Sequence, residues 1–341
     1  MAGVSTGTVD RILHSRGKVS SDAREKVEIV LKEIDYQPNK IARSLALKKE
    51  HHIITLTPCF KEGEYWDSLS KGIDVAEKEL LNYNVTVERW YFDQYDKNSF
   101  DSLIPRFKEV DCQGVVIATL FRESALVLIK QLDELSIPYV LIDAYIEDTN
   151  SIAYYGTPSY NSGRIAGRLL LGQANTGDDI VIFRFYRVND VLSTQVQMRE
   201  NGFRDYLSEM DYKGKVHVVK IHSDDVDNNK SLLDSFFQEN PDVGLGVIFN
   251  SRAYLLGDYI TENQQHRFFR LVGYDAIQAN INYLKENLIT HLIAQRPEVQ
   301  GLNCIKALFR HLVLQEENTA VNYMPLDVLM KENIDFYNNY I

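Results

Sequence analysis

Residues 2–13 read AGVSTGTVDRIL, and the interpretation of the whole chain starts from this stretch. A turn that contains glycine comes before a short predicted helix, and Ser5 is placed to cap this helix by accepting a hydrogen bond from a backbone N–H. The apolar side chains of the helix fall on one face, at Val9, Ile12 and Leu13. The polar side chains fall on the opposite face, at Thr6, Asp10, Arg11 and His14. A helix that is packed along its back and polar along its front is suited to lie in the major groove of DNA.

A second helix is predicted to begin at Ser20 or Ser21 and to end at the sequence YQP, residues 36–38. Asp22 lies near the positive end of the helix dipole, where a carboxylate is favourable. Apolar residues follow at helical spacing: Val27, Val30, Leu31 and Ile34. Proline suits the first position of a helix, so Pro38 is predicted to begin a third, basic segment, PNKIARSLALKK. That segment is too short to be a stable helix alone.

The ordered motifs of residues 1–50 resemble the headpiece and hinge of the LacI/GalR family of transcriptional repressors. These motifs are AGVS, TV, R, VS, REKV, Y, PN and ARSLA. The resemblance implies a helix-turn-helix DNA-binding headpiece at residues 1–37 and a hinge helix and linker at residues 38–50. It also implies contacts to DNA by Ser5, Thr6, Thr8, Arg11, His14, Asn39, Arg43 and Leu45. The alternative, an ordinary three-helix cap on an enzyme, would have to reproduce a dozen spaced positions by accident.

The expectation for Leu45 is the most specific of these. By the resemblance, the leucines of two subunits wedge into the minor groove at the operator centre and kink the DNA. The alternative is that Leu45 packs on the core as a linker anchor.

Two features depart from the family pattern. Family headpieces begin with one further helix ahead of AGVS, so the module is expected to be truncated and to lack the helix that braces the recognition helix. Asp10 stands where the family usually has a small hydroxyl residue facing DNA. Phosphates repel a carboxylate, so Asp10 is expected to accept a hydrogen bond from a cytosine amino group or to pair with a neighbouring arginine.

Charge is divided unevenly along the chain. Residues 1–50 hold 10 Lys and Arg against 7 Asp and Glu, whereas the remainder holds 27 against 41. A weakly basic head on an acidic body suits a protein whose contact with DNA is confined to one end, although the excess of three alone would be unremarkable.

The length of 341 residues allows a small headpiece and roughly two further domains. Nothing in the sequence has the pattern of a signal peptide, and no apolar run approaches the ~20 residues of a membrane span. Cys59, Cys112 and Cys304 are odd in number and scattered, which favours reduced thiols in the cytoplasm over a disulfide framework or a zinc site.

Beyond residue 51, short β-branched runs alternate with helical stretches, as is typical of doubly wound α/β units. Strands are predicted at residues 53–57, 85–91, 114–118 and 139–142, and in a second set at residues 180–185, 216–221, 243–249 and 269–273. Helices are predicted between them, near Trp66, Asn98, Glu123, Leu192, Asn229 and Tyr254. The predicted fold class is α/β, with two doubly wound parallel-sheet subdomains and an N-terminal all-α headpiece. A ligand cleft is expected between the subdomains, because open α/β sheets bind at the carboxyl ends of their strands.

This arrangement resembles the type I periplasmic-binding-protein core of the same family, over residues 51–341. The resemblance implies three chain crossings between the subdomains, near residues 155–158, 289–293 and 316–322. The N-terminal core subdomain is then residues 51–157 plus 290–318, and the C-terminal one residues 158–289 plus 319–341.

Polar side chains directly follow three predicted strands: Asp143 after YVLI, Asn250 after GVIF and Asp275 after LVGY. Each taken alone is as consistent with a turn or cap residue as with a ligand contact. The family resemblance adds Arg199, in the pattern R-x-x-G-F, and Gln295, in IAQRP, as residues that hydrogen-bond the hydroxyls of a sugar. Carboxylates, amides and a guanidinium suit a polyol better than an apolar ligand.

Aromatic residues complete the candidate site. Tyr65 and Trp66 open the first core helix, where the family places residues that stack on a sugar ring, although an aromatic residue at a helix start is more often packing. Phe185 ends a predicted strand beside Arg187, and Arg252 lies two residues past Asn250. Arginines at such places are usually solvated caps, but if both face the cleft the ligand would be anionic, such as a sugar acid.

No catalytic motif stands out: the sequence has no G-x-S-x-G elbow, no Walker loop and no G-x-G-x-x-G after the first strand. The favoured function is a ligand-responsive transcriptional repressor, a homodimer that reads a near-palindromic operator. Its effector is expected to be a sugar, sugar acid or sugar phosphate, and no metal, cofactor or membrane is implied. A transport-type sugar-binding protein is the alternative, disfavoured by the motifs from AGVS to ARSLA and by the missing secretion signal.

Overall fold

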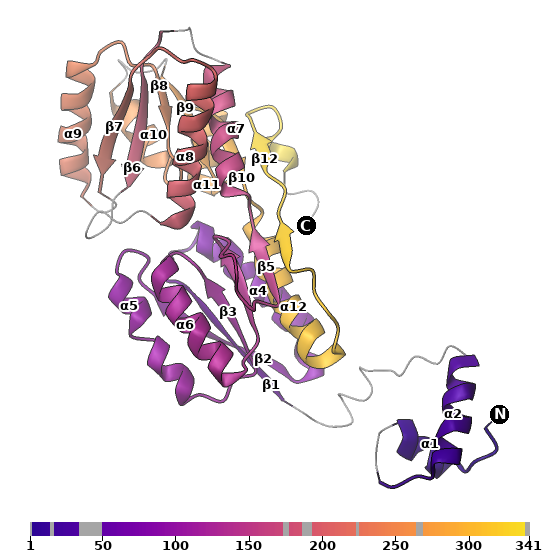
Figure 1. The fold of residues 1–341 in the computed structure, drawn as a ribbon. Coiled ribbons are helices and arrows are strands. Elements are labelled where there is room, and N and C mark those ends of the chain that lie inside the picture. Colours follow the sequence, from indigo (N-terminus) through magenta and orange to yellow (C-terminus); the bar gives the residue numbers. More distant parts are fainter. Residues whose placement is uncertain are drawn as a thin grey trace. The chain divides into compact units, whose positions relative to one another are not determined.

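The computed structural model describes residues 2–13, 17–33, 50–172, 177–185, 193–222, 225–263 and 269–337 (Figure 1). The chain divides into two units, Met1–Lys49 and Glu50–Ile341, and each is described by itself. Four of the expected DNA contacts lie outside the described residues: His14, Asn39, Arg43 and Leu45.

The described part of the headpiece is a pair of helices, α1 (Thr6–Leu13) and α2 (Ser21–Glu33). Both begin after a serine whose hydroxyl accepts from a backbone N–H three residues on: Ser5 from Thr8 at 3.2 Å and Ser20 from Ala23 at 3.4 Å. The helices contact each other, and each buries an apolar side chain, Ile12 and Val27. The predicted cap at Ser5 and the predicted start of the second helix are confirmed.

The first half of the core is built on a six-stranded parallel sheet, in the order β11-β5-β4-β3-β1-β2 over the described residues. Its strands are β1 (His51–Pro58), β2 (Val85–Phe92), β3 (Gly114–Ala118), β4 (Tyr139–Asp143), β5 (Ala153–Gly156) and β11 (Val321–Tyr323). Its helices are α4 (Tyr65–Leu80), α5 (Lys97–Asp101), α6 (Arg122–Leu135) and α12 (Pro297–Phe309). Every residue of β3 and β4 is buried, as expected for parallel strands covered on both faces.

The second half repeats this arrangement in the strand order β12-β10-β9-β8-β6-β7, again over the described residues. Its strands are β6 (Ile180–Phe185), β7 (Val216–Ile221), β8 (Leu245–Val247), β9 (Arg270–Tyr274), β10 (Ile289–Ala294) and β12 (Asp327–Leu329), of which β12 alone is antiparallel to its neighbour. Its helices are α7 (Ser159–Leu171), α8 (Thr194–Glu209), α9 (Val226–Glu239), α10 (Tyr254–Glu262) and α11 (Gln278–Lys285). The two doubly wound parallel units predicted from the sequence are confirmed.

Alternate side chains of β6 enter two separate cores, because successive residues of a strand point to opposite faces. Val181 and Phe183 pack in the cluster that contains the apolar side chains of α9, α10 and α11. Ile182 packs on the other face, with the apolar side chains of α7 and α8. Figure 1 shows the corresponding helices on either side of this sheet.

Two pairs of helices cross at glycines, one pair in each half of the core. In the second half, α7 crosses α8, and a Cβ added at Gly163 would lie 1.8 Å from the carbonyl oxygen of Arg199. In the first half, α4 crosses α12, and a Cβ at Gly72 would lie 1.9 Å from the carbonyl oxygen of Glu298. Any side chain at these positions would push the two backbones apart, so glycine is what allows both helix pairs to pack this closely.

Two of the expected chain crossings lie later in the sequence than predicted. Residues 289–293 belong to β10, which pairs with β9, so the chain returns to the first half only after Ala294. Likewise β11 pairs with β5 of the first sheet, so the third crossing lies between Tyr323 and Asp327 instead of at residues 316–322. The boundaries placed at residues 290 and 319 shift accordingly. Hydrophobic periodicity identifies a strand, but the sheet that the strand joins depends on tertiary hydrogen bonds.

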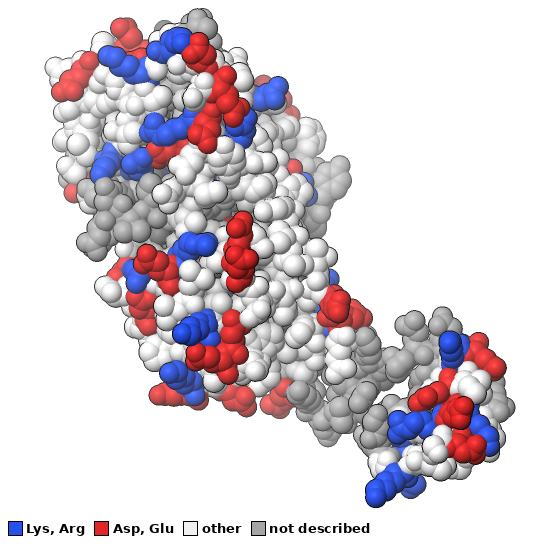
Figure 2. All heavy atoms as spheres, viewed as in Figure 1, with Lys and Arg blue, Asp and Glu red and all other residues white. Residues whose placement is uncertain are grey.

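The surface of the core carries both signs of charge. On the face drawn in Figure 2, acidic and basic side chains lie close to one another over both halves of the core. None of the helices in the described ranges combines the length and the apolar composition that a membrane span requires.

Candidate functional site

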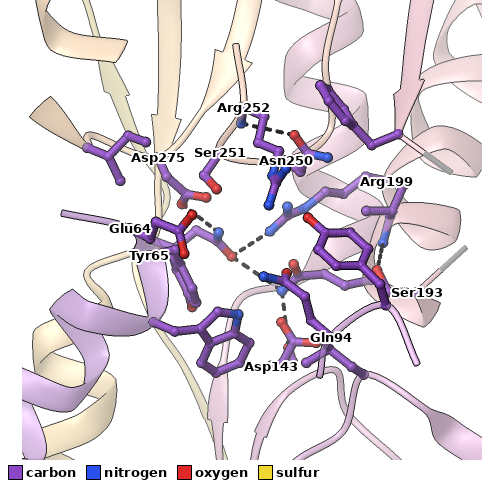
Figure 3. A pocket seen from close by; sticks show the side chains of 18 of the residues that line it. Glu64, Tyr65, Gln94, Asp143, Ser193, Arg199, Asn250, Ser251, Arg252 and Asp275 are labelled. Atoms are coloured by element: carbon purple, nitrogen blue, oxygen red, sulfur yellow. Dashed lines mark hydrogen bonds between the residues drawn. The ribbon is translucent and has the colours of Figure 1, made fainter. Parts of the chain in front are cut away.

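A cavity lies between the two halves of the core, where the carboxyl ends of their strands face each other (Figure 3). Residues from both halves line it, and it opens to solvent. All eight residues proposed as ligand contacts from the sequence line it: Tyr65, Trp66, Asp143, Phe185, Arg199, Asn250, Asp275 and Gln295. The structure therefore brings the whole predicted set together, and that these residues bind a ligand stays a prediction.

Two carboxylates reach the cavity from equivalent places in the two halves. Asp143 is the last residue of β4 and Asp275 directly follows β9, and these strands occupy the same position in their sheets. Both residues have a positive φ, 81° and 66°. A non-glycine residue in this conformation costs about 1–3 kcal/mol and persists only where its surroundings hold it. The backbone at both strand ends is thus strained in a way that directs a carboxylate into the cavity.

A chain of buried hydrogen bonds joins the polar groups of the second half. Arg199 Nη2 donates to Gln295 Oε1 at 2.5 Å, and Gln295 Nε2 donates to Asp275 Oδ1 at 2.7 Å. Arg199 Nη1 donates to the carbonyl oxygen of Phe249 at 2.8 Å. Arg199, Gln295 and Asp275 are almost completely buried, so these bonds fix the orientation of the side chains without competition from bulk water.

Gln295 also ties this network to two of the segments that connect the halves. It directly follows β10, and its Oε1 accepts a second hydrogen bond from Thr157 Oγ1 at 2.9 Å, where Thr157 follows β5. Gln300 Nε2, on α12, donates to the Gln295 carbonyl oxygen at 2.8 Å. One side-chain amide therefore links the cavity to the first and second chain crossings.

Two buried donors at the cavity lack a well-formed hydrogen bond among the described residues: the Tyr65 hydroxyl and Arg199 Nε. The polar neighbour of the hydroxyl is the Gln300 side chain. Burial, with the Asp275 and Asp143 carboxylates nearby, holds the pKa of Tyr65 well above its usual value, so the hydroxyl keeps its proton. Leaving a buried polar group unpaired costs about 1–3 kcal/mol, and a ligand that carries oxygen acceptors would remove that cost.

Burial also changes the acidity of Asp275. It raises the pKa of the carboxyl group to about 6, although the Arg199 charge and the hydrogen bond from Gln295 act in the opposite direction. The charge of the cavity therefore depends on pH in the mildly acidic range.

Aromatic rings form the walls of the cavity. Tyr65 and Trp66 open α4 and meet edge to face, with ring centroids 5.1 Å apart. Phe185 ends β6, and Tyr95 follows β2 in the first half. Flat apolar walls around a few fixed polar groups are common in sites for small ligands.

Several lining residues were not expected from the sequence. Gln94 and Tyr95 follow β2 closely, so the argument from strand ends that identified Asp143 would also have identified them. Ser193 caps α8 by accepting from the Val196 N–H at 3.4 Å, and Gln195 lies in the first turn of the same helix. No sequence pattern indicates that the start of this helix faces the cavity.

The four described residues among the expected DNA contacts lie at or in α1. Ser5, Thr6 and Arg11 are exposed, and Thr8 is half-buried with its hydroxyl 2.9 Å from that of Ser5. Thr6 and Arg11 are therefore accessible to a partner, whereas Ser5 and Thr8 also serve the helix start. In the described ranges, no group of three or more His, Cys, Asp or Glu side chains could hold a metal ion.

Comparison with known families gives two matches. The family described as "Bacterial regulatory proteins, lacI family" matches residues 1–39, and the family described as "Periplasmic binding protein domain" matches residues 54–316. The chain is similar to the ribose operon repressor of Lactococcus lactis subsp. lactis, with 29% identity over 343 residues that cover 98% of this chain and 95% of the relative. It is also similar to the ribose operon repressor of Halalkalibacterium halodurans, with 27% identity over 85% of this chain and 82% of the relative.

Solved structures resemble the core. A putative LacI transcriptional regulator from Bacteroides fragilis is 38% identical, with a TM-score of 0.81 over 85% of this chain and 100% of that one. A glucose-galactose binding protein from Geobacillus stearothermophilus is 20% identical, with a TM-score of 0.71 over 84% of this chain and 99% of that one, and shares the fold.

Proposed function

The chain belongs to the LacI/GalR family of transcriptional regulators, and from this membership we propose that it is a repressor whose headpiece binds operator DNA and whose core cavity binds a sugar-like effector. The observation that carries the proposal is the convergence of polar strand-end residues from both halves on one cavity, with Gln295 linking them to the chain crossings.

The chemistry of the cavity favours a polyol. Asp143 and Asp275 accept hydrogen bonds from hydroxyl groups, Arg199 donates to their oxygen atoms, and Trp66 provides an apolar wall for the C–H face of a ring. Several relatives are named for sugar operons, among them the ribose operon repressors and a sucrose operon repressor of Staphylococcus xylosus. A sugar or sugar derivative is the effector class that agrees with both observations.

Effector binding would act on the angle between the two halves of the core. A ligand held by Asp143 and Asp275 contacts both halves at once and favours the closed arrangement. Gln295 would pass the change on, because its side chain is bonded both to Arg199 and to Thr157 at a chain crossing. The differential affinity of the effector for the open and closed states then sets how strongly it shifts the equilibrium.

We propose that DNA binding uses a homodimer, since one short headpiece makes too few contacts for a tight specific site. In this proposal Thr6 and Arg11 face the major groove and Leu45 wedges into the minor groove. Leu45→Ala should then weaken specific operator binding far more than non-specific binding, which depends mainly on phosphate charge. Equal operator affinity and equal DNA bending in the variant would assign Leu45 to packing instead.

The cavity is proposed to bind its ligand without catalysis, in a protein that works in the cytoplasm with no metal or cofactor. The relatives named above are repressors, not enzymes. A transport-type solute-binding role is disfavoured, because residues 1–39 match the lacI family.

A thermal-unfolding screen of pentoses, hexoses and their acidic derivatives tests the proposal. We expect at least one compound to raise the unfolding temperature of the wild type and to have much less effect on Asp275→Ala, which loses a buried hydrogen-bonding group. The same compound should change the affinity for DNA from upstream of the protein's own gene in a gel-shift titration. Stabilisation that survives in both Asp275→Ala and Arg199→Ala would place the site elsewhere.

A further inference from the structure

Arg252 occupies a distinctive place in the cavity. It lies two residues after Asn250, past the carboxyl end of β8, and its side chain points into the cavity in Figure 3. Its guanidinium carbon is 5.1 Å from the centre of the Tyr95 ring and 5.8 Å from that of Phe185. Tyr95 belongs to the first half of the core and Phe185 to the second, so the cation lies where the two halves face each other.

The guanidinium of Arg252 differs from those of other partly buried arginines in the core. Arg184 bonds both carboxylate oxygens of Glu200 at 2.6 and 2.8 Å, and Arg296 bonds those of Asp327 at 2.7 and 2.9 Å. Arg252 has no carboxylate or other acceptor bonded to its guanidinium within the described residues, where its contacts are the two aromatic rings and a bond from its backbone N–H to Asn250 Oδ1.

Two of the carboxylates that line the cavity have other hydrogen-bond donors. Asp275 Oδ1 accepts from Gln295, and Glu64 Oε2 accepts from the Lys61 N–H at 2.9 Å. Burial also raises the pKa of Asp275 to about 6, which weakens its attraction for a cation and its repulsion of an anion in mildly acidic solution. Neither of these carboxylates is hydrogen-bonded to the guanidinium of Arg252.

We propose that Arg252 binds an oxyanion of the effector, so that the effector is an acidic monosaccharide that carries a carboxylate or phosphate group on a polyol. This inference rests on the proposed function, because it takes the cavity as the effector site. A planar guanidinium matches two oxygens of a carboxylate or phosphate, and the two rings hold the guanidinium in position through cation–π contact. The hydroxyl groups of the ligand then lie toward Asp143 and Asp275, at the ends of β4 and β9.

The test is isothermal titration calorimetry on the full chain with matched pairs of probes. The pairs are D-glucose with D-glucuronate, D-galactose with D-galacturonate, and D-ribose with D-ribose 5-phosphate. We expect the acid of at least one pair to bind more tightly than its neutral counterpart, and the pair identifies whether a carboxylate or a phosphate is preferred. Arg252→Gln should weaken the binding of the acid by at least about tenfold more than it weakens the binding of the neutral sugar. This is the effect expected for a lost hydrogen bond to a charged group.

Two further variants keep this result interpretable. Arg168→Gln makes the same change of charge on the exposed side of α7 and should leave the preference for the acid intact. Arg252→Lys should restore part of the preference, because it returns the charge without the planar fork. Thermal unfolding without ligand shows whether Arg252→Gln is folded. If it is not, the same comparison of acid and neutral sugar is made with Arg252→Lys.

The outcomes separate this inference from the proposed function. Tighter binding of neutral sugars than of every acid, with equal affinities in the wild type and Arg252→Gln, overturns the role of Arg252 and leaves the sugar site in place. Equal loss of acid binding in Arg252→Gln and Arg168→Gln also overturns it, since the effect is then one of net charge. Binding of no probe, neutral or acidic, contradicts the proposed function itself.

Discussion

Adding one methyl group at Gly163 is expected to disturb both the stability of the core and its ligand cavity. The new Cβ would lie 1.8 Å from the Arg199 carbonyl oxygen, whereas real Cβ contacts essentially never fall under 3.0 Å. Helices α7 and α8 would have to separate by at least about 1.2 Å, because the obstacle is backbone and cannot rotate away. Gly163→Ala therefore acts on the helix that carries Arg199.

The structure allows the size of the effect to be worked out. If Arg199 moves with α8, its 2.5 Å hydrogen bond to Gln295 lengthens to roughly 3.7 Å, which is beyond hydrogen-bond range. Overpacking of this kind costs about 1–3 kcal/mol, and the lost buried hydrogen bond adds about 1–3 kcal/mol. At the low end of these ranges the total destabilisation is about 2 kcal/mol. In a domain as large as this core, that lowers the unfolding temperature by roughly 4–8 °C.

Differential scanning calorimetry of the full chain, with and without the sugar that stabilises the wild type, measures both consequences. The matched control is Gly244→Ala, because a Cβ at Gly244 would have no atom within 4 Å. We expect a lowered unfolding temperature and weakened ligand binding in Gly163→Ala, and neither in Gly244→Ala. Wild-type values for both quantities in Gly163→Ala would refute the argument that the crossing of α7 and α8 positions Arg199.

Three further predictions follow from other parts of the structure. Gln295→Leu should destabilise the core by about 3 kcal/mol or more in urea unfolding, because the buried Arg199, Asp275 and Thr157 each lose a hydrogen bond. The exposed Gln278→Leu should change the stability little. The pKa of Asp275 is about 6 in the folded chain against 3.8 in the unfolded one, so the folded state holds the proton more tightly, and the contribution of this group to stability falls by roughly 2 kcal/mol as pH rises from 4 to 6. Urea unfolding of the wild type and Asp275→Asn at pH 4, 6 and 7.5 checks this, and a stability difference that stays constant with pH would contradict it. Ser5→Ala should destabilise the start of α1 by about 1 kcal/mol through loss of the cap to Thr8, which hydrogen exchange of the headpiece amides measures; unchanged exchange would mean that the cap contributes nothing.

The sequence predicts the residues of the cavity well where a polar side chain directly follows a strand. Asp143, Asn250 and Asp275 follow buried apolar runs, and parallel strands bring their carboxyl ends to one edge of a sheet. Arg199 and Gln295 were placed by resemblance to a family, since nothing in the local pattern of a helix or of a strand end distinguishes them.

The parts that could not be predicted depend on contacts between distant residues. Thr157 is an ordinary residue after a strand, and its hydrogen bond to Gln295 spans 138 positions. The apolar run of β10 is visible in the sequence, but its pairing with β9 is what moves the second crossing past Ala294. Three-residue strands such as β11 and β12 are too short to show a period at all.

The helix crossings at Gly72 and Gly163 divide the chain into positions that can be varied and positions that cannot. Variants of this protein made as biosensors for new compounds would come from libraries that randomise cavity residues. Strand-end side chains such as Asn250 are expected to tolerate this, because they do not contact either helix crossing. The two glycines should be kept fixed in such libraries, even though neither touches the ligand cavity. A screen that selects only for a changed response would discard variants at these glycines as unresponsive. The cause would be the separation of two packed helices and not a failure to recognise the compound.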